Sequence, residues 1–596
     1  MSFMFNPFPY NDPNAVNNLT NDGSVHTDRI ARGTAQLAAI FAGLCQGNRV
    51  IAIDGYTTAP FDALIGLLPA DCELISVAGI YKSAAELKAL LADYLPEDRE
   101  KDPVLLYGRL FKEGYRGLFD EKKLAALQKR LAEKRGTVVL YGNGALTEEL
   151  YDLADLHIFA DVTPKQAVLN IKKGSYRNYG SDETLPFKAT MRRCYYVDFE
   201  LAFSLRCRLL AGKKLDWYIC ADAPDTLQMM PGAVLSALID RALDYPLRQR
   251  PVYLEGVWGG YLTMKERRLP DTMKNCAWVF DLIPMEVSTV LNMDGYSVEL
   301  PFYTVVASNG EKLMGARCLR DFHGFFPIRF NYDDTFHAAG NMSIQLHPGE
   351  KFLTENHNEL GRQDESYYIV ATGQGARTYL GFRGDADADE FVSEIKKSEQ
   401  EHTPVDYKKY IYGVRSEPGV QVMIPAGTIH ASGQNQLILE IGSLTVGSYT
   451  YKMYDYLRRD LDGNPRPIHS YFGSLNLNRD MKEDYVRANL VNGRRRVLRN
   501  GTDWEELVVG ECDQLYFSLR NLKFVDGMED NTDGDFHVLA LVDGESITVR
   551  SKKDPSLHFD MNYLDMVVVP ASMGEYELIN NKPGTWITVH KTMLKR

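Results

Sequence analysis

Ser343-Ile-Gln-Leu-His-Pro348 is the stretch from which the fold of this 596-residue chain can be read. Gln345 and His347 are two residues apart, so on a β-strand both side chains leave the same face of the sheet. Glu365 opens an apolar run, Tyr367-Tyr-Ile-Val370, that indicates a second strand. An amide, an imidazole and a carboxylate are therefore expected at neighbouring strand positions.

A third segment brings a further histidine. Residues 419–430 read Gly-Val-Gln-Val-Met-Ile-Pro-Ala-Gly-Thr-Ile-His, a proline–glycine turn that delivers His430 into a strand. Two imidazoles, one carboxylate and one amide oxygen suit zinc or a neighbouring divalent metal and leave room for substrate or water. A Gln-x-His pair by itself is more often an accident of surface or core, but the three segments in this order favour a metal site.

These residues carry a family resemblance. The spacing of Gly419, Pro425, Gly427 and His430 is similar to the second motif of the cupin barrels, with Gln434 where that motif ends in asparagine. The chain from about residue 251 to residue 469 resembles the type I mannose-6-phosphate isomerases, which are zinc-dependent cupins. The other segments that resemble this family are Tyr253–Gly260, Phe326–Ile328 with Ser343–Pro348, Glu440–Ile441 and Tyr454–Arg458.

The resemblance implies a site and a reaction. The implied ligands of zinc, or of another divalent metal, are Gln345, His347, Glu365 and His430. Isomerisation of an aldose to a ketose through a cis-enediol needs a Lewis acid, a base and a cation for the phosphate. Glu440 is the candidate base, although a barrel glutamate in a salt bridge explains it equally well. Arg458 or Lys452 is expected to bind the anionic substrate, with a solvated basic face as the alternative.

The chain departs from the family where the substrate is handled. Asn331 and Gln363 stand where the family usually has lysines, although Arg362 can reach a place similar to that of Gln363. Lys452 stands where the family has an arginine, which keeps the charge but loses the bidentate fork. Metal binding is therefore better supported than specificity for mannose 6-phosphate.

The N-terminal residues have a different pattern of predicted strands and helices. Short apolar strands alternate with helices through residues 1–245, which predicts a doubly wound α/β domain followed by a linker. The segment from Val50 to Gly55 runs into a loop that resembles the phosphate loop of nucleoside kinases. Pro60, Phe61 and Asp62 take the positions of its Gly-Lys-Ser/Thr, and none of them suits a phosphate. We expect a degenerate, non-catalytic kinase-like domain.

Two mainly β domains are expected after it, so the predicted class is multidomain, with an α/β domain and tandem cupin barrels. Residues 246–470 are assigned to the metal-binding cupin, with a helical insertion at about residues 385–412. Residues 471–596 are assigned to a second cupin. Pro570-Ala-Ser572 has no histidine equivalent to His430, so this second barrel is expected to be metal-free.

The composition of the chain limits which partners and which cellular compartment we expect. A net charge of -13 makes nucleic acid an unexpected partner, because phosphate binding needs a basic surface. No apolar run has transmembrane length and no secretory signal is evident, so no membrane partner is expected. The eight scattered cysteines are typical of reduced, buried thiols in a cytoplasmic protein. The oligomeric state stays open.

Two functions remain in view. The first is a metal-dependent aldose–ketose isomerase of a phosphosugar, most simply of mannose 6-phosphate and fructose 6-phosphate or a related sugar. The second is a metal-bearing, sugar-binding regulatory protein without turnover. The complete ligand set favours the enzyme, and the altered cationic positions favour the regulator.

Overall fold

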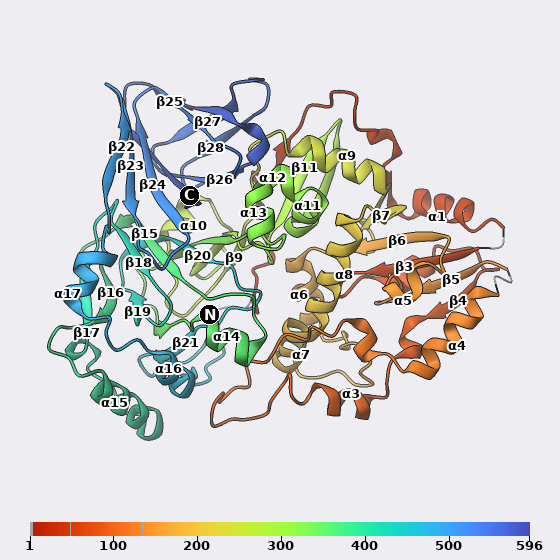
Figure 1. Ribbon diagram of the computed structural model, residues 1–596, viewed down its shortest axis with the longest axis horizontal. Helices are drawn as coiled ribbons and strands as arrows, with labels where there is room; N and C mark the ends of the chain where they lie inside the picture. Colours follow the sequence, from red (N-terminus) through yellow and green to blue (C-terminus); the bar gives the residue numbers. More distant parts are fainter. Residues whose placement is uncertain (1–3, 48, 134–135, 596) are drawn as a thin grey trace.

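A mixed seven-stranded sheet forms the centre of the N-terminal half (Figure 1). The computed structural model describes residues 4–47, 49–133 and 136–595. The sheet has the order β2-β8-β7-β6-β3-β5-β4, in which the five strands from β7 to β4 run parallel. β8 is antiparallel to its two neighbours, β7 and β2, so β2 runs in the direction of the five. The strands are β2 (Ala31–Arg32), β3 (Val50–Gly55), β4 (Glu73–Ser76), β5 (Val138–Tyr141), β6 (Leu156–Asp161), β7 (Trp217–Cys220) and β8 (Gln228–Pro231).

Helices connect these strands, as the alternating pattern predicts. Leu124, Leu127 and Leu131 of α4 are buried along one face of a charged helix, and Ser83 and Glu86 form the predicted capping box of α3. The helices are α1 (Gly33–Leu44), α2 (Phe61–Ile65), α3 (Ala84–Leu91), α4 (Glu121–Ala132), α5 (Glu148–Tyr151), α6 (Pro164–Lys172), α7 (Phe187–Arg193), α8 (Phe199–Ala211) and α9 (Gly232–Ala242).

One predicted strand of this half is wrong. Residues 104–107 read as a strand from their apolar run, but they pair with no strand among the described residues. Instead, the hydroxyl group of Tyr107 donates to the carbonyl oxygen of Thr450 at 2.7 Å, and its ring packs against Tyr449, Tyr451 and His469. Of these four residues only Tyr107 is buried, and Val104 is exposed, so the apolar run reflects the contacts of Tyr107 with the first barrel and not the pairing of a strand.

The first barrel is built from two antiparallel sheets. Their orders are β9-β10-β13-β20-β15-β18 and β17-β16-β19-β14-β21. The strands are β9 (Val252–Leu254), β10 (Trp278–Leu282), β13 (Ile328–Asp334), β14 (Ile344–Leu346), β15 (Glu365–Thr372), β16 (Arg377–Phe382), β17 (Ile411–Arg415), β18 (Gln421–Ile424), β19 (His430–Ser432), β20 (Gln436–Ser443) and β21 (Tyr451–Tyr454).

Helices accompany this barrel. The predicted helical insertion is confirmed as α15 (Ala388–Glu401), which Asp387 caps by accepting from two backbone amides. The other helices of this part are α10 (Leu262–Glu266), α14 (Glu350–His357), α16 (Ser470–Asn476) and α17 (Glu483–Tyr485).

The second barrel repeats the larger sheet of the first. Its six-stranded sheet has the order β22-β23-β24-β31-β26-β29, and a four-stranded sheet, β25-β30-β27-β28, faces it. The strands are β22 (Arg496–Asn500), β23 (Trp504–Gly510), β24 (Phe517–Phe524), β25 (Gly527–Asn531), β26 (His537–Asp543), β27 (Ser546–Ser551), β28 (His558–Asn562), β29 (Met566–Val569), β30 (Glu575–Asn580) and β31 (Ile587–Leu594).

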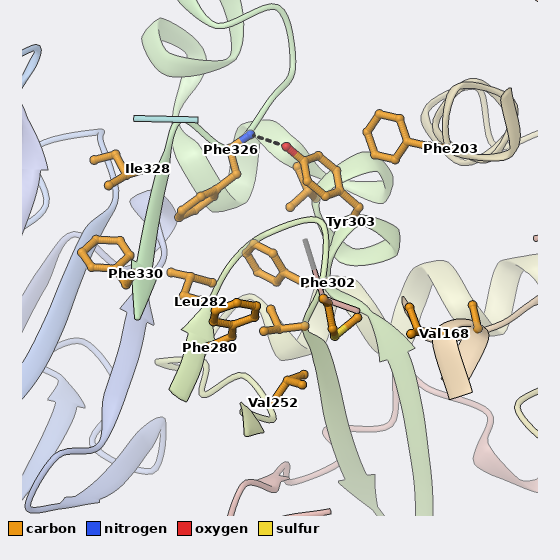
Figure 2. Packing of buried hydrophobic residues seen from close by; sticks show 14 of the residues in the cluster. Val168, Phe203, Val252, Phe280, Leu282, Phe302, Tyr303, Phe326, Ile328 and Phe330 are labelled. Atoms are coloured by element: carbon orange, nitrogen blue, oxygen red, sulfur yellow. Dashed lines mark hydrogen bonds between the residues drawn. The ribbon is translucent and has the colours of Figure 1, made fainter. Parts of the chain in front are cut away.

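A helical unit joins the α/β half to the barrels. It contains α11 (Phe302–Ser308), α12 (Gly310–Met314) and α13 (Ala316–Asp321) beside the hairpin of β11 (Ser288–Met293) and β12 (Tyr296–Pro301). Figure 2 shows the packing: the ring of Tyr303 lies 4.8 Å from that of Phe203, and its hydroxyl group accepts from the backbone of Phe326 at 3.2 Å. One buried cluster runs through all three parts, so the domain limits at residues 245 and 470 stay predictions.

The N-terminal residues also join the parts. Strand β1 (Asn17–Asn18) pairs in parallel with β11. The side-chain amide of Asn17 donates to the carbonyl oxygens of Arg248 and Val290 at 2.9 and 3.0 Å, and its oxygen accepts from the backbone of Arg248 at 2.9 Å. Arg248 in turn pairs with Asp565 of the second barrel at 2.6 Å. None of the helices among the described residues is long and apolar enough to cross a membrane.

We expect Asn17→Ala to lower the free energy of unfolding by about 2 kcal/mol or more, because it leaves three buried backbone groups without a partner. Asn18→Ala is the matched control, since Asn18 is exposed and contacts Asn292 at the surface. Its effect should stay within about 0.5 kcal/mol. Urea unfolding followed by tryptophan fluorescence measures both, and equal midpoints would contradict the bridging role of Asn17.

Candidate metal centre

Three buried side chains from three strands converge inside the first barrel. His347 directly follows β14, Glu365 opens β15 and His430 opens β19, and one ligand atom from each lies within 4.8 Å of the others. Oε2 of Glu365 is 3.0 Å from Nε2 of His347 and 3.5 Å from Nε2 of His430. These three atoms are fully enclosed and have no hydrogen-bond partner. Buried polar atoms are normally satisfied, so three orphaned atoms facing one point fit a divalent cation.

The opposite ring nitrogens fix how the imidazoles point. Nδ1 of His347 lies 2.9 Å from the carbonyl oxygen of Tyr449, and Nδ1 of His430 lies 2.9 Å from that of Thr428. A carbonyl can only accept, so both Nδ1 atoms carry the proton and both Nε2 lone pairs face the centre. Burial lowers the pKa of His347, which favours the neutral form that binds metals.

Glu365 is held by its other carboxylate oxygen. Oε1 accepts from the guanidinium of Arg329 at 2.9 Å and from the side-chain amide of Gln363 at 3.2 Å. The side-chain oxygen of Gln363 accepts from the backbone of Tyr449 at 2.8 Å, which fixes the direction of the amide. Its nitrogen also lies 2.8 Å from Nδ1 of His347, but both atoms are donors, so this is a packing contact. One buried glutamine therefore orients Glu365 and lies against the ring of His347.

Backbone contacts bring the ligand segments together. Gly427 has φ +86°, a conformation that favours glycine, and its N–H donates to the carbonyl oxygen of His347 at 2.7 Å. Gln345 pairs with His430 across β14 and β19. The hydroxyl group of Ser343 donates to the side-chain oxygen of Gln345 at 3.0 Å. Gln345 thus lies beside the three converging atoms, and its role as a fourth ligand stays a prediction.

A cavity of about 40 Å³ lies against this centre. Gln345, Glu365 and Glu440 line it, together with Arg329 and Asn331. Pockets that hold small molecules usually measure about 300–1,000 Å³, so this one must open to admit a sugar phosphate. The segment from residue 444 to residue 450 forms one wall.

Glu440, the predicted base, faces the cavity from β20. Burial raises its pKa well above the usual value, and the neighbouring Glu365 and Asp333 raise it further. Asp333 is its hydrogen-bonded partner, and burial raises the pKa of Asp333 to about 7. Two carboxyl groups that cannot both ionise share a proton, which is the state needed to take up and return one.

Lys452 and Arg458 do not line this cavity. Both face Asp455: Nζ of Lys452 is 4.0 Å from that carboxylate, and the Arg458 guanidinium pairs with it directly. Burial lowers the pKa of Lys452 to about 8, and Arg466 adds to the decrease. Their role in binding an anionic substrate stays a prediction.

Arg329 and Asp333 are the residues that reading the sequence missed. Arg329, Asn331 and Asp333 alternate along β13 and are all buried. Polar residues at every second position of an otherwise apolar strand are a signal for a polar pocket on one face, and that pattern was available in the sequence.

A second small cavity adjoins the first. It shares Met285, Glu286 and Val446 with the metal-site cavity, and its far side is lined by residues of the N-terminal half such as Tyr195 and Arg206. The Tyr195 hydroxyl group donates to Oε1 of Glu286 at 3.2 Å, and burial raises the pKa of Glu286 to about 7. The α/β half therefore forms part of the surroundings of the site.

Sequence comparison finds relatives that match part of the chain. The chain is 26% identical over 230 residues to a mannose-6-phosphate isomerase of Streptococcus mutans, and 27% identical over 228 residues to the mannose-6-phosphate isomerase ManA of Bacillus subtilis. These matches cover 37% and 38% of this chain and 65% of each relative. The chain thus spans just under two thirds of the length of these relatives.

A family model and a solved structure also match parts of the chain. A family model described as a domain of unknown function, DUF8485, matches residues 33–244. A crystal structure of the mannose 6-phosphate isomerase of Bacillus subtilis aligns with 58% of this chain and 99% of its own, at 18% identity and a TM-score of 0.46.

Gln363→Ala should weaken zinc binding by about 10–100-fold, because it removes the amide that donates to Oε1 of Glu365 and leaves that carboxylate free to rotate. His430→Ala should weaken it further, since it removes a ligand. His558→Ala, at an exposed histidine of β28, is the control and should leave affinity unchanged. Titration against a chromophoric chelator measures all three, and equal affinities for Gln363→Ala and the control would refute the orienting role.

Proposed function

We propose that this protein is a metal-dependent aldose–ketose isomerase of a phosphosugar, mannose 6-phosphate and fructose 6-phosphate or a closely related pair. The observation that carries the proposal is the convergence of three orphaned ligand atoms beside the proton-sharing pair of Glu440 and Asp333. The similarity to mannose-6-phosphate isomerases over about 230 residues supports the same reaction.

His347, Glu365 and His430 would hold the metal, with Gln345 as the fourth ligand. Two imidazoles and a carboxylate are a usual set for a catalytic zinc, which leaves positions for substrate. The metal, when bound, supplies a Lewis acid that stabilises negative charge on the sugar oxygens.

Glu440 acts as the base in this proposal. At the start Asp333 holds the proton that the pair shares, so Glu440 is ionised and can take the proton from C2 of the open-chain aldose. Glu440 returns that proton to C1, through a cis-enediol, and the carboxyl group of Asp333 is its hydrogen-bonded partner in both transfers. Arg329 keeps Glu365 ionised and correctly turned, because the guanidinium pairs with Oε1 of that carboxylate.

Phosphate recognition requires the site to open. Arg329 is the cation that lines the cavity among the described residues, and it already pairs with Glu365. Lys452 and Arg458 are the proposed phosphate ligands, and both would have to leave Asp455 in part. The wall at residues 444–450 is fastened by Glu359, which accepts from the backbones of Val446 and Gly447 at 3.0 and 2.6 Å.

We also infer that the α/β half is a non-catalytic relative of the P-loop kinases. Its parallel strands have the order β4-β5-β3-β6-β7, so the chain reverses direction across the sheet at β3, where such folds bind ligands. At the end of β3 the carboxylate of Asp54 accepts from the amides of Gly55, Gly144 and Leu146. Among these amides, that of Gly55 belongs to the loop after β3, and the next amide of that loop, Tyr56, donates to the carbonyl oxygen of Ala160. Two amides at the place of a phosphate loop are thus satisfied by the chain itself, in agreement with the unsuitable Pro60-Phe61-Asp62.

Zinc-loaded protein should convert mannose 6-phosphate to fructose 6-phosphate in a coupled assay, and His430→Ala should abolish the activity. A panel of other sugar phosphates and free sugars tests the substrate class in the same assay. Absence of turnover across the panel, with a stoichiometric metal still bound, would contradict the enzyme and favour a regulatory sugar-binding protein.

Glu440→Gln should lower kcat by about 10²–10⁴-fold while the metal content stays at the wild-type level, because the amide cannot carry the proton. Glu417→Gln, at an exposed glutamate, is the matched control. Metal analysis alongside the kinetics separates the two roles of a carboxylate at this place. A parallel loss of metal and activity would assign Glu440 to the ligands.

A further inference from the structure

The two barrels share one strand order in their larger sheets. From β9 to β18 and from β22 to β29, each strand has one counterpart, so β13, β20 and β15 correspond to β24, β31 and β26. The ends of the matched strands also agree. β20 ends at Ser443, which pairs with the first residue of β13, Ile328. β31 ends at Leu594, which pairs with the first residue of β24, Phe517. Positions in the second barrel can therefore be matched one by one.

The matched positions carry different charges. In the first barrel Asn331 pairs with Glu440, and in the second the same place is taken by the pair of Arg520 and Lys591. Glu365 opens β15, one residue before Ser366, and His537 opens β26, one residue before Val538. The polar place of the first barrel is thus kept in the second, with an arginine, a lysine and a histidine instead of an asparagine and two glutamates.

Around these side chains lies a cavity of about 320 Å³. Its floor is an ion network: Nζ of Lys591 lies 2.7 Å from Glu506 and 2.6 Å from Asp530, and Arg520 lies 2.9 Å from Glu506. Lys591 is 1% exposed and Glu506 is 3% exposed. Although burial opposes ionisation, Lys591 holds the pKa of both Glu506 and Asp530 at about 2.

This ion network would lower the stability of the barrel if its only role were structural. Desolvating charges costs several kcal/mol for each ion, and apolar residues of similar volume usually stabilise a core as well or better. The remainder of this barrel follows that rule, with a core of leucine, valine, isoleucine and aromatic side chains. His537 adds a buried ring nitrogen, Nε2, with no hydrogen-bond partner, beside the cavity.

The charge balance indicates the class of ligand. Among the described residues, the cavity is lined by four cations, five carboxylates, an asparagine, a histidine and one methionine: Arg499, Arg520, Lys552, Lys591, Glu506, Glu529, Asp530, Asp533, Glu575, Asn531, His537 and Met593. Fixed donors alternate with fixed acceptors, and the near balance of charge gives an anion no advantage. Sugar hydroxyl groups both donate and accept, so an uncharged polyhydroxylated molecule fits this lining.

We propose that the second barrel binds a neutral sugar or polyol in this cavity, separately from the metal centre of the first barrel. The cavity is lined by strands of both sheets of this barrel: β22, β23, β24, β31 and β26 of the larger one, and β25 and β30 of the smaller one. Binding there requires neither the metal nor the isomerase reaction. This proposal can therefore be tested independently of the proposed function.

Saturation-transfer difference NMR on the full chain tests the site, with D-mannose, D-sorbitol and inorganic phosphate as probes. The His430→Ala variant removes a ligand of the first site and should bind the neutral probes as the wild type does. In that background Arg520→Gln and Lys552→Gln should each weaken binding by about tenfold, which corresponds to the loss of one charge-assisted hydrogen bond.

The test includes a matched control and a second, exposed variant. Lys553→Gln is the matched control, because Lys553 is exposed next to Lys552 but does not line the cavity. Lys552 is exposed as well, so its substitution reports on binding even if Arg520→Gln fails to fold. Affinities for the neutral probes that stay unchanged in Lys552→Gln and Arg520→Gln, binding of phosphate alone, or no binding at millimolar concentration would each overturn the proposal.

Discussion

The first barrel depends on a single buried carboxylate with two different oxygens. Oε1 of Glu365 is satisfied by Arg329 and Gln363, whereas Oε2 faces two imidazole nitrogens and has no hydrogen-bond partner. An arrangement of this kind is stable only when a cation completes it, because an unsatisfied buried carboxylate oxygen is costly. Gln363 donates to the carboxylate and lies against the ring of His347, and the strand pairing of Gln345 with His430 brings the remaining segment close. The metal site is thus part of the way the two sheets are held together.

The two barrels show how one topology serves different interiors. Both larger sheets have the same strand order and register, but the matched polar positions hold acids in one and bases in the other. In the first barrel burial raises the pKa of Glu440 and Asp333, and the neighbouring Glu365 raises both further, which suits proton transfer. In the second barrel every buried acid is matched by a base, so the groups stay ionised and offer fixed donors and acceptors.

The α/β half is continuous with the barrels. Its helix α8 packs against the joining helices, and Tyr195 reaches Glu286 at the edge of the metal-site cavity. The metal-site cavity measures about 40 Å³, which is small for a sugar phosphate. A substrate can therefore enter only if the two halves, or the wall at residues 444–450, move. The same contacts explain why residues 104–107, apolar in sequence, are a packed loop.

The sequence alone determined the strands that carry the ligands, the alternating strands and helices of the N-terminal half and the helix at Ala388–Glu401, because period and turn chemistry are local properties. It also identified His347, Glu365 and His430, since their spacing survives in three short motifs. Only the tertiary structure decided that Arg329, Asp333 and Gln363 surround Glu365 and Glu440, that Lys452 and Arg458 face Asp455, and that Arg520, Lys591 and His537 share a cavity. Those relations join residues that are distant in the chain, and their charges acquire meaning only when burial removes water from between them.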